Sequence, residues 1–211
     1  MTSRRLTAEA SPNTVSLTIE SRHLRHIYDG GFTLIELMVT LLILAILLAI
    51  AIPTFLAVTR SAAGRVAQAN ANTALLDSKS TFYTSGQSFP PVTTLITALN
   101  ATEKTLTFQT APSTNHSQIS IYVATDQSSM IMAVRSNSEK DCWYTIVNGR
   151  AEAATTGTPY KRLPASVLGA GTYFGEAKVP ATGVAPTCQA SAVLAPSAGA
   201  VAYQSGSFPH L

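Results

Sequence analysis

Charge is scarce in this chain. Asp, Glu, Lys and Arg make up only 12% of the 211 residues, and the formal net charge is +3. The Lys and Arg residues are scattered, so the composition does not by itself predict a nucleic-acid-binding protein. The length allows one domain of ordinary size with an attached segment, and hardly two full domains.

Cysteine and histidine are also few. The chain has two cysteines, Cys142 and Cys188, and only His116 and His210 follow residue 31. No CxxC spacing occurs, so we expect no metal site and assign no cofactor.

Catalytic motifs are missing as well. The chain contains no G-x-S-x-G, H-E-x-x-H or P-loop sequence, so we predict that it is not an enzyme. Three carboxylates, Asp126, Glu139 and Asp141, could help to bind calcium, but scattered loop carboxylates are usually solvated. A membrane-tethered enzyme stays open as a third interpretation, which catalytic activity of residues 59–211 would support.

Apolar residues are concentrated in one stretch. Between Leu34 and Ile52 the only polar residues are Glu36 and Thr40. As a helix this stretch is roughly 28 Å long, close to the thickness of the hydrocarbon core of a bilayer. We therefore predict one membrane-spanning helix, with a carboxylate near its start that is costly unless something compensates it.

Basic residues come before the apolar stretch. Arg4, Arg5, Arg22 and Arg25 lie there, with Asp29 as the only acid close to the stretch. By the positive-inside rule the N-terminus stays in the cytoplasm and the C-terminal domain lies outside it. An even cysteine count in a translocated domain favours a disulfide between the two cysteines, and two buried free thiols are the alternative.

The pattern beyond Pro53 is amphipathic. It predicts a helix that continues to about Tyr83 and is kinked or loosened at Pro53. Gly86 and Pro90-Pro91 end it, and a short helical turn over residues 95–99 follows. The predicted apolar face consists of Ala63, Val66, Ala67, Ala71, Ala74, Leu75 and Phe82.

The period then changes to two. We predict at least three antiparallel strands, starting at Gln118, Met130 and Cys142, with a fourth candidate at Gly171. A sheet with one apolar face would cover the apolar face of the helix, which gives an α+β fold. Residues 189–211 are rich in Ala, Ser, Gly and Pro, and we interpret them as a mobile, low-complexity tail.

The segment GGFTLIELMVTLLILAILLAIAIPTF resembles the N-terminal processing and methylation segment of type IV prepilins and pseudopilins. Gly31 matches the residue before the scissile bond, Phe32 the residue after it, Glu36 the fifth residue of the mature chain and Pro53 the twenty-second. The resemblance implies the type IV pilin-like fold, in which a long N-terminal helix packs on a C-terminal antiparallel sheet.

The resemblance also implies what is done to this chain. A prepilin peptidase would cut between Gly31 and Phe32, where a residue without Cβ allows close approach of the protease. The new Phe32 amine would then be N-methylated. Gly30 either assists cleavage or serves only as a linker. The alternative to processing is a permanent signal anchor, which would need neither Gly30 nor Gly31.

Glu36 is implied to act in assembly. The Phe32 amine would lie about 6 Å from it along a continuous helix, and the amine of an incoming subunit could pair with the Glu36 of a neighbour in a filament. The alternative is a snorkelling carboxylate without a partner. Pro53 would either let the helix stretch in the filament or form an ordinary kink.

These predictions divide the chain into five parts. They are a cleaved cytoplasmic leader (1–31), a membrane and assembly helix (32–58), an amphipathic half-helix (59–85), a sheet domain with a disulfide-bounded region (86–188) and the tail (189–211). The expected function is that of a structural filament subunit in adhesion, twitching motility or DNA uptake. The precursor would lie in the bacterial inner membrane and the mature form in an extracellular pilus.

The implied partners are other copies and minor pilins, a prepilin peptidase, an assembly ATPase and an inner-membrane platform. DNA is a weaker candidate, because basic residues such as Arg150, Lys161 and Arg162 more often form a plain solvated face. Within the family, a pseudopilin of a type II secretion or competence system is the alternative. Outside it, an uncleaved membrane-anchored surface binding domain is supported by the long leader of 31 residues.

Overall fold

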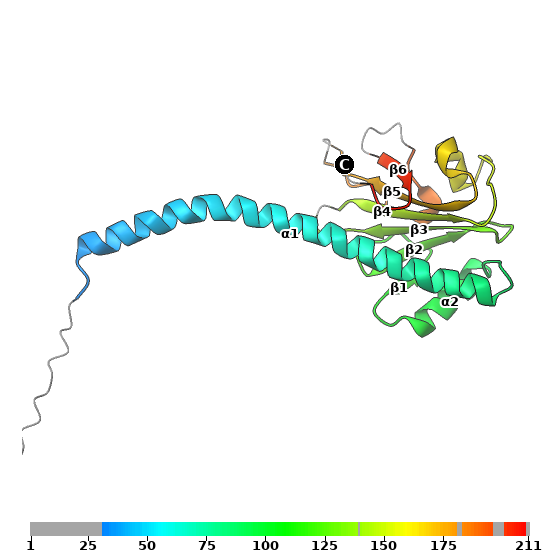
Figure 1. Ribbon diagram of the computed structural model, residues 1–211, viewed down its shortest axis with the longest axis horizontal. Helices are drawn as coiled ribbons and strands as arrows, with labels where there is room; N and C mark the ends of the chain where they lie inside the picture. Colours follow the sequence, from blue (N-terminus) through cyan, green and yellow to red (C-terminus); the bar gives the residue numbers. More distant parts are fainter. Residues whose placement is uncertain (1–30, 139, 181–182, 196–200, 210–211) are drawn as a thin grey trace, which may run out of the picture. The chain divides into compact units, whose positions relative to one another are not determined.

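The computed structural model describes residues 31–138, 140–180, 183–195 and 201–209 (Figure 1). The predicted leader therefore lies almost wholly outside the described residues. Two α-helices are followed by six strands, and the predicted α+β, type IV pilin-like architecture is confirmed. The helices are α1 (Leu34–Thr84) and α2 (Val92–Thr102), and the strands are β1 (Thr107–Gln109), β2 (Gln118–Val123), β3 (Ser129–Arg135), β4 (Cys142–Asn148), β5 (Gly171–Ala177) and β6 (Val201–Ser205).

Helix α1 runs through Pro53 and ends at Thr84, as the sequence pattern predicted. Proline has no N–H, so the carbonyl of Ala49 loses its usual helical partner. The Thr54 hydroxyl donates to the neighbouring carbonyls of Ile50 and Ala51, at 3.2 and 2.9 Å. The helix thus continues with one backbone hydrogen bond fewer at this position.

The strands lie side by side in chain order from β1 to β6, as the labels in Figure 1 show. The four predicted strands are confirmed, β1 pairs with β2 in parallel, and every other pair is antiparallel. Strand β1 has only three residues, too few for a period of two to be recognised.

Strand β6 corrects the prediction of a mobile tail. Its residues pair with β5, with Tyr203 opposite Gly175. A Cβ placed on Gly175 would lie 2.4 Å from the Tyr203 ring, so the close approach of this ring requires glycine at that point. The small residues around β6 gave the segment a low-complexity composition that concealed a five-residue strand.

One face of the sheet packs on the second half of α1. Ala67, Ala71, Ala74 and Leu75 of the helix are buried in one cluster with residues of the sheet and of α2. The small side chains bring the helix backbone close to the sheet. The prediction of the apolar face is correct for these four residues, but it is wrong for Val66, which is 43% exposed.

The opposite face of the sheet is covered as well, which the sequence pattern had not predicted. The segments after β4 and around Cys188 place a second buried cluster on it, including Tyr160, Leu163, Val167 and Val193. Strand β4 is buried at every position, because alternate side chains point to opposite faces and both faces are covered.

Gly64 provides a test of the contact between helix and sheet. A Cβ at this position would lie 3.6 Å from Cζ2 of Trp143, an ordinary contact distance. Alanine has a higher helix propensity than glycine in a helix interior. We therefore expect Gly64→Ala to stabilise the folded chain by roughly 0.5–1 kcal/mol. Thermal unfolding measures the effect, and a lower melting temperature would show that the helix cannot accept the methyl group.

Asp77 of α1 lies 25 residues beyond the apolar stretch that ends at Ile52. Its Oδ2 is buried without a hydrogen-bond partner. Burial, and then the charge of Glu103, raise the pKa of Asp77 above its ordinary value of 3.8. The folded state therefore holds this proton more tightly than the unfolded chain does, and wild-type stability falls as the pH rises through the raised pKa.

We expect Asp77→Asn to stabilise the folded chain at pH 7 by about 0.5 kcal/mol, because it removes a charge that is partly buried and lies next to Glu103. The gain should shrink as the pH approaches 3.8, where the wild-type carboxyl is itself protonated in the folded state. Denaturant unfolding at several pH values measures this. A gain that does not change with pH would contradict the electrostatic explanation.

Candidate processing and assembly site

Helix α1 begins just after the predicted cleavage point. Residues 31–33 are not helical, and the first helical hydrogen bond runs from the Leu37 N–H to the Thr33 carbonyl at 3.2 Å. The Glu36 N–H donates to Thr33 Oγ1 at 3.3 Å. Thr33 therefore caps the helix in the uncleaved chain, where no continuous helix joins Phe32 to Glu36. The distance of about 6 Å between the Phe32 amine and Glu36 concerns the cleaved chain and stays a prediction.

Sequence reasoning missed the capping role of Thr33. The spacing Thr33-x-x-Glu36 is that of a capping box, in which threonine satisfies the amide of the fourth residue of the motif. The signal was thus present in the sequence. It gives Glu36 a place at the start of the helix, where the helix dipole favours a carboxylate whether or not a second subunit is present.

Gly31 occupies open space. A Cβ placed on it would meet no other atom within 4 Å, and its φ lies outside the left-handed region. The fold of this chain therefore does not require glycine at position 31. The neighbouring Phe32 is 79% exposed, so the Gly31–Phe32 bond lies in an accessible, non-helical segment.

The apolar surface of α1 has no cover within the described chain. Every large apolar residue from Phe32 to Val58 is between 46% and 79% exposed. By length and composition, α1 is the one helix among the described residues that could cross a membrane. Exposed apolar surface on this scale is stable only in lipid or against other protein.

Cys142 and Cys188 form a disulfide, with their Cα atoms 5.3 Å apart. Hydrogen bonds hold the same region, since the Cys188 carbonyl accepts from the Ser113 N–H at 2.7 Å. Arg135 donates from Nε to the Ser113 carbonyl at 3.1 Å and from Nη2 to the Pro186 carbonyl. The returning segment is thus held at Pro186 and at Cys188 by hydrogen bonds as well as by the disulfide.

The other candidate sites are not assembled. Asp126 and Asp141 lie at opposite ends of β3, too far apart to share a calcium ion, and Glu139 is outside the described residues. The described residues hold no group of three or more His, Cys, Asp or Glu side chains that could bind a metal. Trp143 is 4% exposed and packs edge-on against Phe208, as expected of a core residue.

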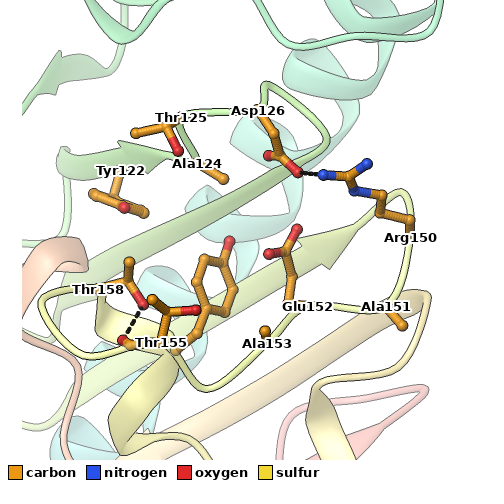
Figure 2. A pocket seen from close by; sticks show the side chains of 11 residues that line it. Tyr122, Ala124, Thr125, Asp126, Arg150, Ala151, Glu152, Ala153, Thr155 and Thr158 are labelled. Atoms are coloured by element: carbon orange, nitrogen blue, oxygen red, sulfur yellow. Dashed lines mark hydrogen bonds and ion pairs between the residues drawn. The ribbon is translucent and has the colours of Figure 1, made fainter.

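One of the three basic residues considered for DNA binding is already in an ion pair. Arg150 pairs with Asp126 (Figure 2), so its charge is partly compensated. Lys161 and Arg162 are exposed at the end of the 3-10 helix η1 (Pro159–Arg162). Two exposed cations are typical of a solvated face.

Comparison with family models gives a match over residues 28–52, to the prokaryotic N-terminal methylation motif. Comparisons with curated proteins and with solved structures give no match. The matched residues contain Gly31, Phe32 and Glu36, and they end within the exposed apolar stretch of α1. Residues 28–52 are therefore the cleavage and methylation signature of type IV prepilins, carried by a chain with type IV pilin-like architecture.

Proposed function

We propose that this chain is the precursor of a structural subunit of a type IV pilus-like filament. One observation carries the proposal. The methylation motif lies on an accessible Gly31–Phe32 bond and leads directly into an apolar helix that the rest of the described chain leaves bare. A surface of this kind suits first a bilayer and then the core of a polymer.

The same helix serves two purposes in this proposal. Before assembly, residues 34–52 hold the subunit in the inner membrane, with the sheet domain outside the cytoplasm. After extraction, their apolar side chains pack against the helices of neighbouring subunits. Glu36 would pair with the Phe32 amine of a neighbour, because a carboxylate in an apolar environment is stable only when its charge is compensated.

The proposal requires several partners. A prepilin peptidase would cut the chain, the new Phe32 amine would be N-methylated, and an assembly ATPase with an inner-membrane platform would add subunits to the filament. Copies of this chain and minor pilins would form the filament, which would serve adhesion, twitching motility or DNA uptake. The chain itself would perform no catalysis.

The experiment that tests the proposal is the intact mass and N-terminal sequence of the protein from membranes and from sheared cell surfaces. We expect a chain that begins at methylated Phe32 in the sheared fraction. Gly31→Val should leave the leader attached, because the new side chain blocks close approach of the peptidase. Gly64→Ala, a glycine substitution remote from the scissile bond, is the matched control and should be processed normally.

Two other outcomes would redirect the proposal. A chain that still carries its leader and occurs only in membranes would contradict processing and favour the anchored binding domain. A chain that is processed but absent from surface filaments would favour a pseudopilin of a secretion or competence system.

A further inference from the structure

Local hydrogen bonds set the start of helix α1. Phe32, Leu34 and Ile35 are 66–79% exposed, so side-chain packing within the described chain does not hold this end of the helix. The Thr33 hydroxyl accepts from the backbone N–H of Glu36 at 3.3 Å. This contact satisfies one of the N–H groups that the first turn of a helix leaves unpaired.

The predicted scissile bond lies just outside the helix that Thr33 caps. Residues 31–33 are not helical and are exposed. Exposed segments without regular structure are the preferred sites of proteolytic cleavage, because no helical turn encloses the carbonyl that is attacked. The position of the helix start therefore decides whether the Gly31–Phe32 bond is open to a peptidase.

The described chain offers a second possible start two residues earlier. Glycine is about as good an N-cap residue as threonine, whereas valine and alanine are poor ones. A helix capped by Gly31 would include Phe32 in its first turn. The Gly31 carbonyl would then accept the first helical hydrogen bond, from the N–H of Ile35. The carbonyl at the scissile bond would be paired and less accessible.

The position of Glu36 favours the start at Thr33. Counted from Thr33, Glu36 is the third residue of the helix and lies in its first turn, where the helix dipole stabilises a carboxylate. Counted from Gly31 it would be the fifth residue, beyond the first turn. The cap and the carboxylate thus support the same start.

We propose that Thr33 is a positioning residue for processing, because its cap stops α1 short of Gly31 and leaves the Gly31–Phe32 bond open to a prepilin peptidase. The inference rests on the proposed function, since it concerns the same cleavage. Thr33 takes no part in breaking the bond. It acts through the position at which the helix begins.

The test is the cleavage of the full chain in detergent micelles by a purified prepilin peptidase. Thr33→Val keeps the shape of the side chain and a similar helix propensity, but it removes the oxygen that accepts from the Glu36 N–H. We expect KM to rise about fivefold with kcat unchanged, because a smaller fraction of the chain has the bond outside the helix. A fivefold change corresponds to about 1 kcal/mol, a typical loss for an N-cap.

Thr40→Val is the matched control. The Thr40 hydroxyl donates to the Leu37 carbonyl at 2.8 Å within α1, so the same substitution there leaves the helix start in place and should not change cleavage. Thr33→Ser and Thr33→Asn supply a good cap with different side chains, and both should keep KM close to that of the wild type. In NMR spectra, the Cα signals of Gly31 and Phe32 should move to helical values in Thr33→Val and stay in place in Thr40→Val.

Three results would overturn the inference and leave the cleavage itself in place. One is a KM for Thr33→Val equal to or below that of the wild type. Another is a raised KM without helical shifts at Gly31 and Phe32. The third is normal cleavage of Thr33→Ser with slow cleavage of Thr33→Asn, because the peptidase would then recognise the hydroxyl itself. A wild-type chain that the peptidase does not cut would instead contradict the proposed function.

Discussion

A chain carrying Glu36→Gln is expected to be cleaved after Gly31 and retained in the membrane, but to be lost from the sheared surface fraction by about tenfold or more. The expected loss follows from one missing charge pair in an environment without water, where about 1.4 kcal/mol corresponds to a factor of ten. Without the Glu36 charge, the amine of the incoming subunit would be buried unpaired, which costs several kcal/mol.

Glutamine is the informative replacement because it leaves the start of α1 unchanged. The Thr33 hydroxyl accepts from the backbone N–H of residue 36, and glutamine serves at this position of a capping box as well as glutamate does. Glu36→Leu would remove both the charge and the polar side chain. A difference between the two variants therefore separates helix capping from charge pairing.

The readout is immunoblotting of sheared and membrane fractions together with the intact mass of the chain. Glu103→Gln is the matched control, because it makes the same chemical change at a carboxylate that follows α2, far along the chain from residues 31–36. Wild-type amounts of Glu36→Gln in the sheared fraction would contradict the assembly role. An uncleaved variant would show instead that the peptidase reads Glu36.

The sequence carried enough information to predict the helix and the central strands. The apolar run from Leu34 and the amphipathic period beyond Pro53 predicted α1, and strands β2 to β5 followed from runs of β-branched and aromatic residues. Strand β1 is too short for such a period, and β6 lies in a segment of low complexity. In both, pairing with a neighbouring strand decides the structure, and pairing is not visible in local composition.

The covering of the second face is a tertiary effect of the same kind. The segment before β5 and the segment around Cys188 place Val167 and Val193 on the sheet, although neither segment has a regular period. The one sequence signal was the near-continuous apolar character of β3 and β4, which is typical of strands covered on both faces.

Local and long-range features differ in how far the sequence could predict them. The processing motif is local, so the spacing of Gly31, Phe32 and Glu36 identifies it directly. By contrast, the contacts of Asp126 and Glu152 with the Ser128 hydroxyl join different segments that the β3–β4 pairing brings together, so local sequence could not predict them. Thr33 is an intermediate case, since its spacing to Glu36 was visible but only the structure shows the hydrogen bond.

Cys142→Ser is expected to lower the free energy of unfolding of the sheet domain by about 4 kcal/mol, the chain-entropy value for a closed loop of this size. The disulfide joins residues separated by 46 positions. Within this loop lie Tyr160, Leu163 and Val167, which cover the second face of the sheet. Without the disulfide, the unfolded chain would have more conformational entropy. The segment that covers the second face would therefore detach from the sheet more readily.

A loss of this size is a large share of the 5–15 kcal/mol that stabilises a typical domain, and it corresponds to a fall in melting temperature of about 10 °C. Cys188→Ser should have the same effect, and the double variant should not be less stable than either single one, because all three remove one bond. Reduction of the wild-type chain is the control without a substitution and should give the same midpoint. A loss below about 1 kcal/mol would mean that Arg135 and the hydrogen bond from Ser113 to Cys188 hold the returning segment without the disulfide.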